Sequence, residues 1–92
     1  MSVRERAPIR RRIQAGIATA VADGLEPKSI YLTPDDRREL LQSLRATGEW
    51  RRGQPEPEQL GGLPLKRVSD RGRSQIYCRH GVARAVPLRP PP

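Results

Sequence analysis

Apolar residues recur every four positions near the start of the chain, at Ile9, Ile13, Ile17 and Val21. This spacing places them on one stripe of an α-helix. Pro8 suits the first helical position, and Asp23-Gly24 suits the end, because glycine readily adopts the left-handed cap conformation. The pattern therefore predicts a helix that begins near Pro8 and stops at Asp23-Gly24.

The segment TPDDRRELLQSLRATG, residues 33–48, carries the signals of a second helix. Thr33 is a favourable N-cap residue, and Pro34 suits the first helical position. The two aspartates that follow complement the positive end of the helix dipole. Gly48 suits the C-terminal cap. The apolar face of this predicted helix is formed by Leu40, Leu41 and Leu44.

Four β-like runs flank these helices: SIYLT (29–33), LPLKRV (63–68), SQIYCR (74–79) and VARAVPL (82–88). The last three are predicted to form a meander of antiparallel hairpins, with turns at residues 69–72 and at His80-Gly81. Residues 49–62 contain two prolines and three glycines without periodicity, which predicts a loop. Trp50, at the start of this loop, is predicted to fold back as a core anchor.

These elements predict an α+β fold with a small, mostly antiparallel sheet of about four strands and two helices on one face. A chain of 92 residues forms one domain at most. The expected organisation is a flexible basic arm at residues 1–7, a single domain at residues 8–88, and a Pro-rich tail at residues 89–92. The second face of the sheet would stay open and carry polar and basic side chains.

Charge is segregated along the chain. The net charge is +8, and sixteen of the eighteen basic residues are arginine. Residues 1–12 carry +4 and residues 63–92 carry +6, whereas residues 13–62 carry −2. Because arginine favours planar contacts with phosphates and carboxylates, the basic ends indicate an anionic partner. A GC-rich genome would also enrich arginine, but it would not remove the acidic counter-charges.

The candidate binding residues follow from this charge pattern and from the strand period. An arginine-rich arm is typical of segments that track a polyanion. In the β-rich part, Tyr77 and Arg79 alternate onto one face with Gln75, which would give a stacking ring beside a guanidinium. Ile76 and Cys78 would share the other face. The full set is Arg4, Arg6, Arg10, Arg11, Arg12, Lys66, Arg67, Arg71, Arg73, Tyr77, Arg79 and Arg84.

The same sequence argues against catalysis and cofactors. Cys78 and His80 are the only cysteine and histidine, too few for a structural zinc site and incapable of an intrachain disulfide. No glycine-rich phosphate loop or nucleophile elbow is present. Asp35-Asp36 is explained by helix capping. No run approaches the roughly 20 apolar residues of a membrane span. The chain is expected to be a non-enzymatic protein without metal or cofactor and without a membrane partner.

Two segments of the chain resemble part of the apical-domain region of tailed-phage major capsid proteins. They are KSIYLTPDDRRELLQSLRATGEW at residues 28–50 and LGGLPLKRVSD at residues 60–70. There a strand leads through a P-x-D cap into a helix, and a strand of the LLGLPV type follows. The chain has no room for the rest of that shell fold. The resemblance therefore implies a small accessory protein of phage or prophage type, located in the host cytoplasm or in the virion.

Two functions follow from these observations. The first is binding of a nucleic-acid backbone, DNA or RNA, without strong sequence specificity, since no sequence-reading motif is present. The alternative is a protein-interaction role on an acidic surface, either as a virion component or as an inhibitor of a host nucleic-acid-handling complex. The edge of residues 82–88 also offers a means of homo-oligomer formation, which Pro87 limits.

Overall fold

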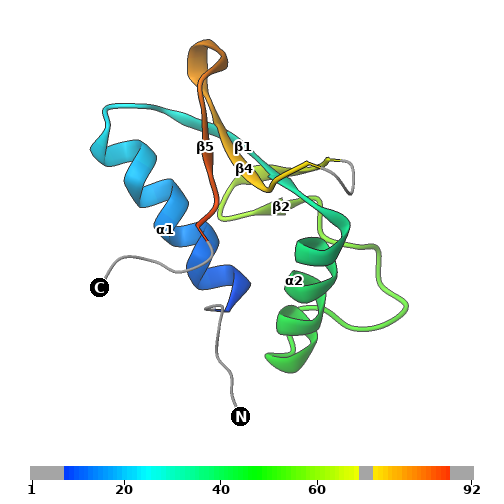
Figure 1. Ribbon diagram of the computed structural model, residues 1–92. Helices are drawn as coiled ribbons and strands as arrows, with labels where there is room; N and C mark the ends of the chain where they lie inside the picture. The colour runs from blue at the N-terminus through cyan, green and yellow to red at the C-terminus, as the bar shows by residue number, and fades with distance from the viewer. Residues whose placement is uncertain (1–7, 69–71, 88–92) are drawn as a thin grey trace.

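The computed structural model describes residues 8–68 and 72–87. Arg4, Arg6 and Arg71 lie outside the described residues, as do the predicted arm at 1–7, most of the turn at 69–72 and the tail at 89–92. The elements in chain order are α1 (Ile9–Ala22), β1 (Pro27–Leu32), α2 (Pro34–Ala46), β2 (Gln59–Leu60), β3 (Leu63–Arg67), β4 (Gln75–Cys78), the 3-10 turn η1 (Arg79–Gly81) and β5 (Ala83–Ala85) (Figure 1).

The strands form one five-stranded sheet in the order β2-β3-β1-β4-β5. Strands β1 and β3 are parallel, and the other three pairs are antiparallel. The α+β prediction is confirmed, with one strand more than expected because β2 forms within the predicted loop 49–62. The predicted three-stranded meander is wrong, because β1 inserts between β3 and β4. A central position gives β1 a neighbouring strand on both sides, and Ile30 and Leu32 of this strand are completely buried there.

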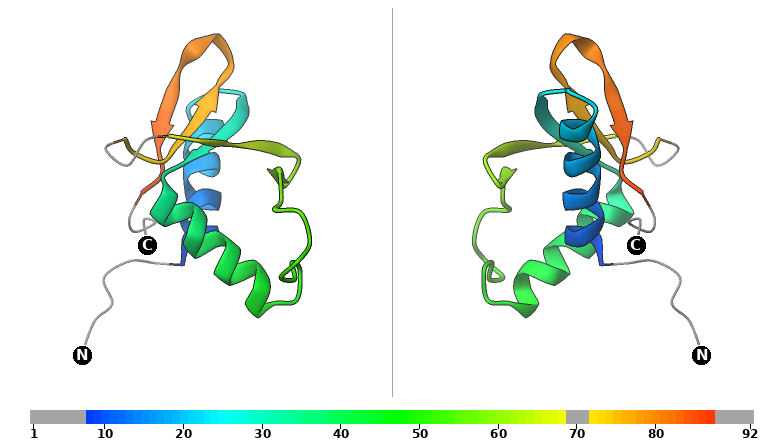
Figure 2. Two further views of the ribbon diagram at one scale, coloured as in Figure 1. Left: turned by 90° about the vertical axis from the view of Figure 1, so that its right-hand side faces the viewer. Right: turned by 90° about the vertical axis from the view of Figure 1, so that its left-hand side faces the viewer.

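Both helices lie on one side of the sheet (Figures 1 and 2). Helix α1 packs against β1, β4 and β5, and α2 packs against α1 and β1. Gly16 permits a close approach of α1 to β4, since a Cβ atom there would lie 3.1 Å from Cγ1 of Ile76. Trp50 packs against the core as predicted, and its indole N–H donates to the carbonyl of Pro55 (3.1 Å). The buried core comprises Ile9, Ile13, Ala20, Ile30, Leu32, Leu40, Leu44, Ile76, Cys78 and Val86.

The helix boundaries follow the local signals. Helix α1 ends at Ala22, and Gly24 has the positive φ (79°) that its position after the helix requires. Pro8 occupies the N-cap, so α1 begins one residue later than expected. Helix α2 begins at Pro34, as predicted, and the Thr33 hydroxyl accepts a hydrogen bond from the Asp36 amide (3.2 Å).

Replacing Thr33 with alanine is expected to lower the free energy of unfolding by about 1 kcal/mol, because the Asp36 amide would lose its capping acceptor. Thr33→Ser keeps the hydroxyl and should stay within about 0.5 kcal/mol of the parent protein. Urea unfolding monitored by Trp50 fluorescence measures both variants. Equal losses in the two variants would contradict a capping role for the hydroxyl.

Arg12 does not belong to an exposed basic arm, contrary to the expectation from sequence. It is 1% exposed, and its guanidinium contacts Asp36 (3.2 Å) and Glu39 (3.1 Å) of α2. The physical reason is helical geometry, since position 12 lies one turn after buried Ile9. The Ser74 hydroxyl donates to the second Asp36 oxygen (2.5 Å), so this buried network joins α1, α2 and the segment before β4.

Candidate nucleic-acid interface

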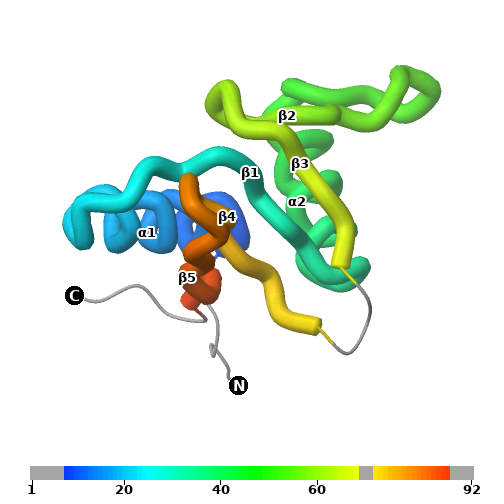
Figure 3. The backbone as a smooth tube through the Cα atoms, turned by 90° about the horizontal axis from the view of Figure 1, so that it is seen from above, coloured from blue at the N-terminus to red at the C-terminus, as the bar shows by residue number. Residues whose placement is uncertain are grey.

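The sheet face opposite the two helices, here called the open face, is defined by strand register. Ile30, Leu32 and Ile76 point into the core, so the residues that alternate with them point to the open face. One row of cross-strand partners on this face is Lys66, Tyr31, Gln75 and Ala85. The neighbouring row pairs Ser29, Tyr77 and Ala83. No described helix packs on these rows, and in Figure 3 the strands lie in front of α2.

Two tyrosines meet at the centre of the open face. Tyr31 of β1 and Tyr77 of β4 are diagonal neighbours, with ring centroids 5.5 Å apart and planes inclined by 54°. Tyr77 is 39% exposed and Tyr31 is half-buried. Tilted aromatic pairs at this separation attract each other, so each ring restricts the other. The result is an apolar, preorganised surface of two π-systems on a strongly basic protein.

One lysine flanks the aromatic pair. Lys66 is exposed and lies directly beside Tyr31 in the register. Arg73, exposed just before β4, instead lines a concave site with Asp35 and Asp36 of α2. Among the described residues, neither Lys66 nor Arg73 has an ion-pair partner, and none of the residues in the two rows is acidic. An anion that approached the tyrosines would therefore meet the positive charge of Lys66 and no strand carboxylate.

Most of the other predicted arginines are already paired. Arg10 binds Glu49 through two contacts (2.5 and 3.2 Å), and Arg84 binds Asp23 (3.1 Å). Arg84 is the register partner of Ile76, and Arg67 is the partner of Leu32, so both belong to the helix-covered side. The structure thus does not bring Lys66, Arg67 and Arg84 together on one rim.

Arg79 is ion-paired, and Arg11 lies on α1 away from the open face. Arg79 is in η1, after the end of β4, and contacts Glu26 (3.4 Å). A hydrogen bond from Lys28, reinforced by Arg79, lowers the pKa of the Glu26 carboxyl. Glu26 therefore stays ionised and offsets the charge of Arg79. Arg11 is exposed on α1, which lies on the opposite side of the sheet from the open face.

Tyr31 is the residue that sequence reasoning missed. It lies between buried Ile30 and buried Leu32, so alternation alone places it on the opposite face of its strand. The missing information was that β1 pairs with β4, which brings Tyr31 beside Tyr77 from a distant part of the chain. A search for aromatic residues on the polar side of every predicted strand would have found it.

Cys78 and His80 lie in different surroundings. Cys78 is 1% exposed, and its thiol faces the carbonyl of Ile76 (3.8 Å). His80 is exposed in the turn between β4 and β5, with a left-handed φ of 68°. Within residues 8–68 and 72–87, no three His, Cys, Asp or Glu side chains gather in a metal-binding group. No helix in these ranges is long and apolar enough to cross a membrane.

Comparison with protein-family models, with curated proteins and with solved structures finds no match to this chain. The fold and the site define a small α+β protein with an aromatic, cation-flanked open sheet face. The function of that face has to be inferred from its own chemistry.

Proposed function

We propose that this protein is a non-enzymatic binding protein that holds nucleic acid on its open face without strong sequence specificity. The observation that carries the proposal is the Tyr31–Tyr77 pair at the centre of a sheet face, beside Lys66, which has no described ion-pair partner. Every base has a π-face, so aromatic side chains hold unpaired bases regardless of sequence. Lysine and arginine neutralise the phosphates beside them.

The protein's charge supports a polyanionic ligand. A net charge of +8 on 92 residues accelerates association with nucleic acid through long-range attraction. The open face offers few fixed donors and acceptors, because its rows consist mainly of tyrosine, alanine, one glutamine and one lysine. Base identity is read by hydrogen bonds to base edges, so binding here is expected to be sequence-tolerant.

The first test is a salt titration with fluorescein-labelled oligonucleotides followed by fluorescence anisotropy. A mixed-sequence single strand is expected to bind with a Kd of about 1 μM or tighter near 50 mM salt. Affinity should fall roughly ten- to hundredfold by about 200 mM salt, as phosphate contacts release counterions. A second, unrelated sequence should bind within about threefold of the first. Absence of binding to DNA and RNA at low salt would overturn the proposal.

The resemblance to tailed-phage capsid segments stays a prediction about origin. It would make this protein an accessory factor of a phage or prophage, acting in the host cytoplasm or in the virion. The alternative role, in a virion or as an inhibitor of a host nucleic-acid-handling complex, also stays a prediction. A stoichiometric complex with one protein that survives nuclease treatment would favour this protein-interaction role over nucleic-acid binding on the open face.

A further inference from the structure

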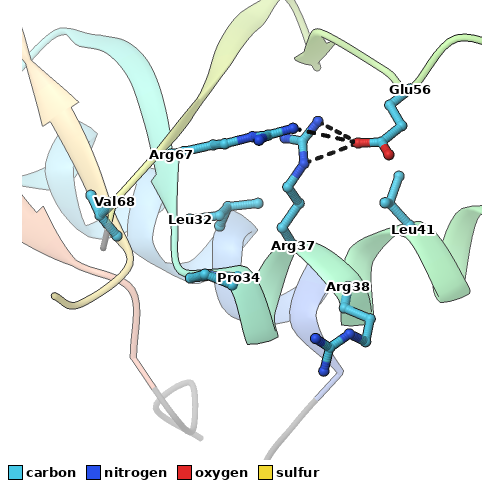
Figure 4. Close-up of a pocket in the computed structure, with 8 residues that line it drawn as sticks. All are labelled: Leu32, Pro34, Arg37, Arg38, Leu41, Glu56, Arg67 and Val68. Carbon is cyan, nitrogen blue, oxygen red and sulfur yellow. Dashed lines mark hydrogen bonds and ion pairs between the residues drawn. The ribbon is translucent and has the colours of Figure 1, made fainter. Parts of the chain in front are cut away.

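A separate concave site lies on the helix-covered side, between α2, the end of β3 and the connection of residues 47–58 (Figure 4). Its volume is about 320 Å³, which is in the range of small ligand pockets. Half of its lining is apolar and half is charged. The lining residues are Leu32, Pro34, Leu41, Val68, Arg37, Arg38, Arg67 and Glu56.

The pocket already holds a carboxylate supplied by the protein itself. One Glu56 oxygen accepts hydrogen bonds from Nε (3.2 Å) and Nη2 (2.9 Å) of Arg37. The same oxygen lies 4.0 Å from Nη2 of Arg67. Figure 4 shows both guanidiniums directed at Glu56 from different elements, whereas Arg38 is directed away and pairs with Asp35 (3.5 Å). Two positive charges thus converge on one negative charge.

The two partners differ in how firmly the fold holds them. The Arg37 side chain is only 15% exposed, so its guanidinium is positioned by its surroundings. Glu56 is 46% exposed and belongs to a connection without helix or strand at that point. Exposed ion pairs stabilise proteins weakly, so Glu56 can be exchanged for another carboxylate at little cost. The arginines form the site, and Glu56 occupies it as an internal ligand.

We propose that this pocket docks an acidic side chain of a partner protein, whose carboxylate replaces Glu56 between Arg37 and Arg67. An aliphatic residue next to that acid would cover Leu41 and Val68, which are partly exposed. The group already bound is a carboxylate, and the base of the pocket is apolar. This combination fits a Leu-Glu or Leu-Asp dipeptide segment of a protein better than it fits a phosphate. The pocket is on the opposite side of the sheet from the tyrosines, so this proposal does not depend on nucleic-acid binding.

The test uses the uniformly ¹⁵N-labelled full-length protein and the capped dipeptide acetyl-Leu-Glu-amide. Titration is expected to shift the resonances of Arg37 Nε–H, Arg67 and Val68, with a Kd of about 1 mM. Removing the internal competitor with Glu56→Gln should tighten binding roughly two- to fivefold, because the site is then vacant more of the time. Arg67→Gln should weaken binding of the dipeptide. It should not unfold the protein, because the Arg67 side chain is 74% exposed.

The chain provides a matched control in Glu58, an exposed glutamate of the same connection without a described ion-pair partner. Glu58→Gln makes the same change in net charge and should leave the dipeptide affinity unchanged. The proposal is overturned by equal binding of acetyl-Leu-Gln-amide, by no tightening in Glu56→Gln, or by no shifts in the pocket. Shifts produced by inorganic phosphate at lower concentration than the dipeptide would identify a phosphate site instead.

Discussion

Replacing Arg12 with methionine is expected to lower the free energy of unfolding by about 3 kcal/mol or more. Methionine fills a similar volume, so the loss comes from Asp36 and Glu39, which would keep their negative charges beside a buried apolar side chain. A chain of this length is stabilised by roughly 5–14 kcal/mol in total. The melting temperature should therefore fall by about 12–24 °C, measured by circular dichroism.

Arg11 provides the matched control for this prediction. Arg11→Met removes the same charge from the neighbouring position, where the side chain is exposed and has no described ion-pair partner. It should change the free energy of unfolding by no more than about 0.5 kcal/mol. The double variant Arg12→Met/Asp36→Asn should recover part of the loss, because the two residues interact directly. Equal effects of Arg11→Met and Arg12→Met would show that the network does not stabilise the fold.

The helices were predictable because their signals are local. The cap at Thr33, the proline that follows it and the glycine after α1 each act within one or two helical turns. Strand pairing was not predictable in the same way. The runs at 63–68 and 74–79 are close in sequence and suggest a hairpin, yet the apolar run around Ile30 takes the place between them. Burying that run depends on contacts from distant segments, which local propensity does not encode.

The roles of the arginines were harder to predict for a related reason. Net charge counts every basic residue equally, whereas accessibility depends on which carboxylates the fold brings near. Arg10 meets Glu49 and Arg84 meets Asp23 across long sequence separations. Arg12 is an exception, because its burial could have been predicted from the sequence. Its helical spacing from Ile9 places it on the buried stripe. Lys66 remains available because it forms no ion pair with a described carboxylate, whereas Arg73 lines a concave site that also contains Asp35 and Asp36.

The tyrosine pair is the part of the interface with the largest expected effect on binding. Tyr77→Ala is expected to weaken single-stranded DNA binding about tenfold, and Tyr31→Ala/Tyr77→Ala about a hundredfold, since each base stacked on an aromatic ring contributes about 1–3 kcal/mol. The phenylalanine variants keep the rings and should bind within about threefold of the parent protein. Fluorescence anisotropy at constant low salt measures the series, with circular dichroism confirming that each variant is folded.

Charge variants separate stacking from electrostatics on the same face. Lys66→Gln should reduce the salt dependence of binding by about 0.7 in the slope of log K against log salt, the value for one contact with a single strand. Arg45→Gln removes the same charge near the end of α2, away from the tyrosines, and should leave that slope unchanged. If the tyrosine variants bind as tightly as the parent while Lys66→Gln and Arg45→Gln weaken binding equally, the interaction is diffuse attraction to a basic surface. A stacking site requires the opposite pattern, in which ring loss dominates and the effect of charge depends on its position beside the rings.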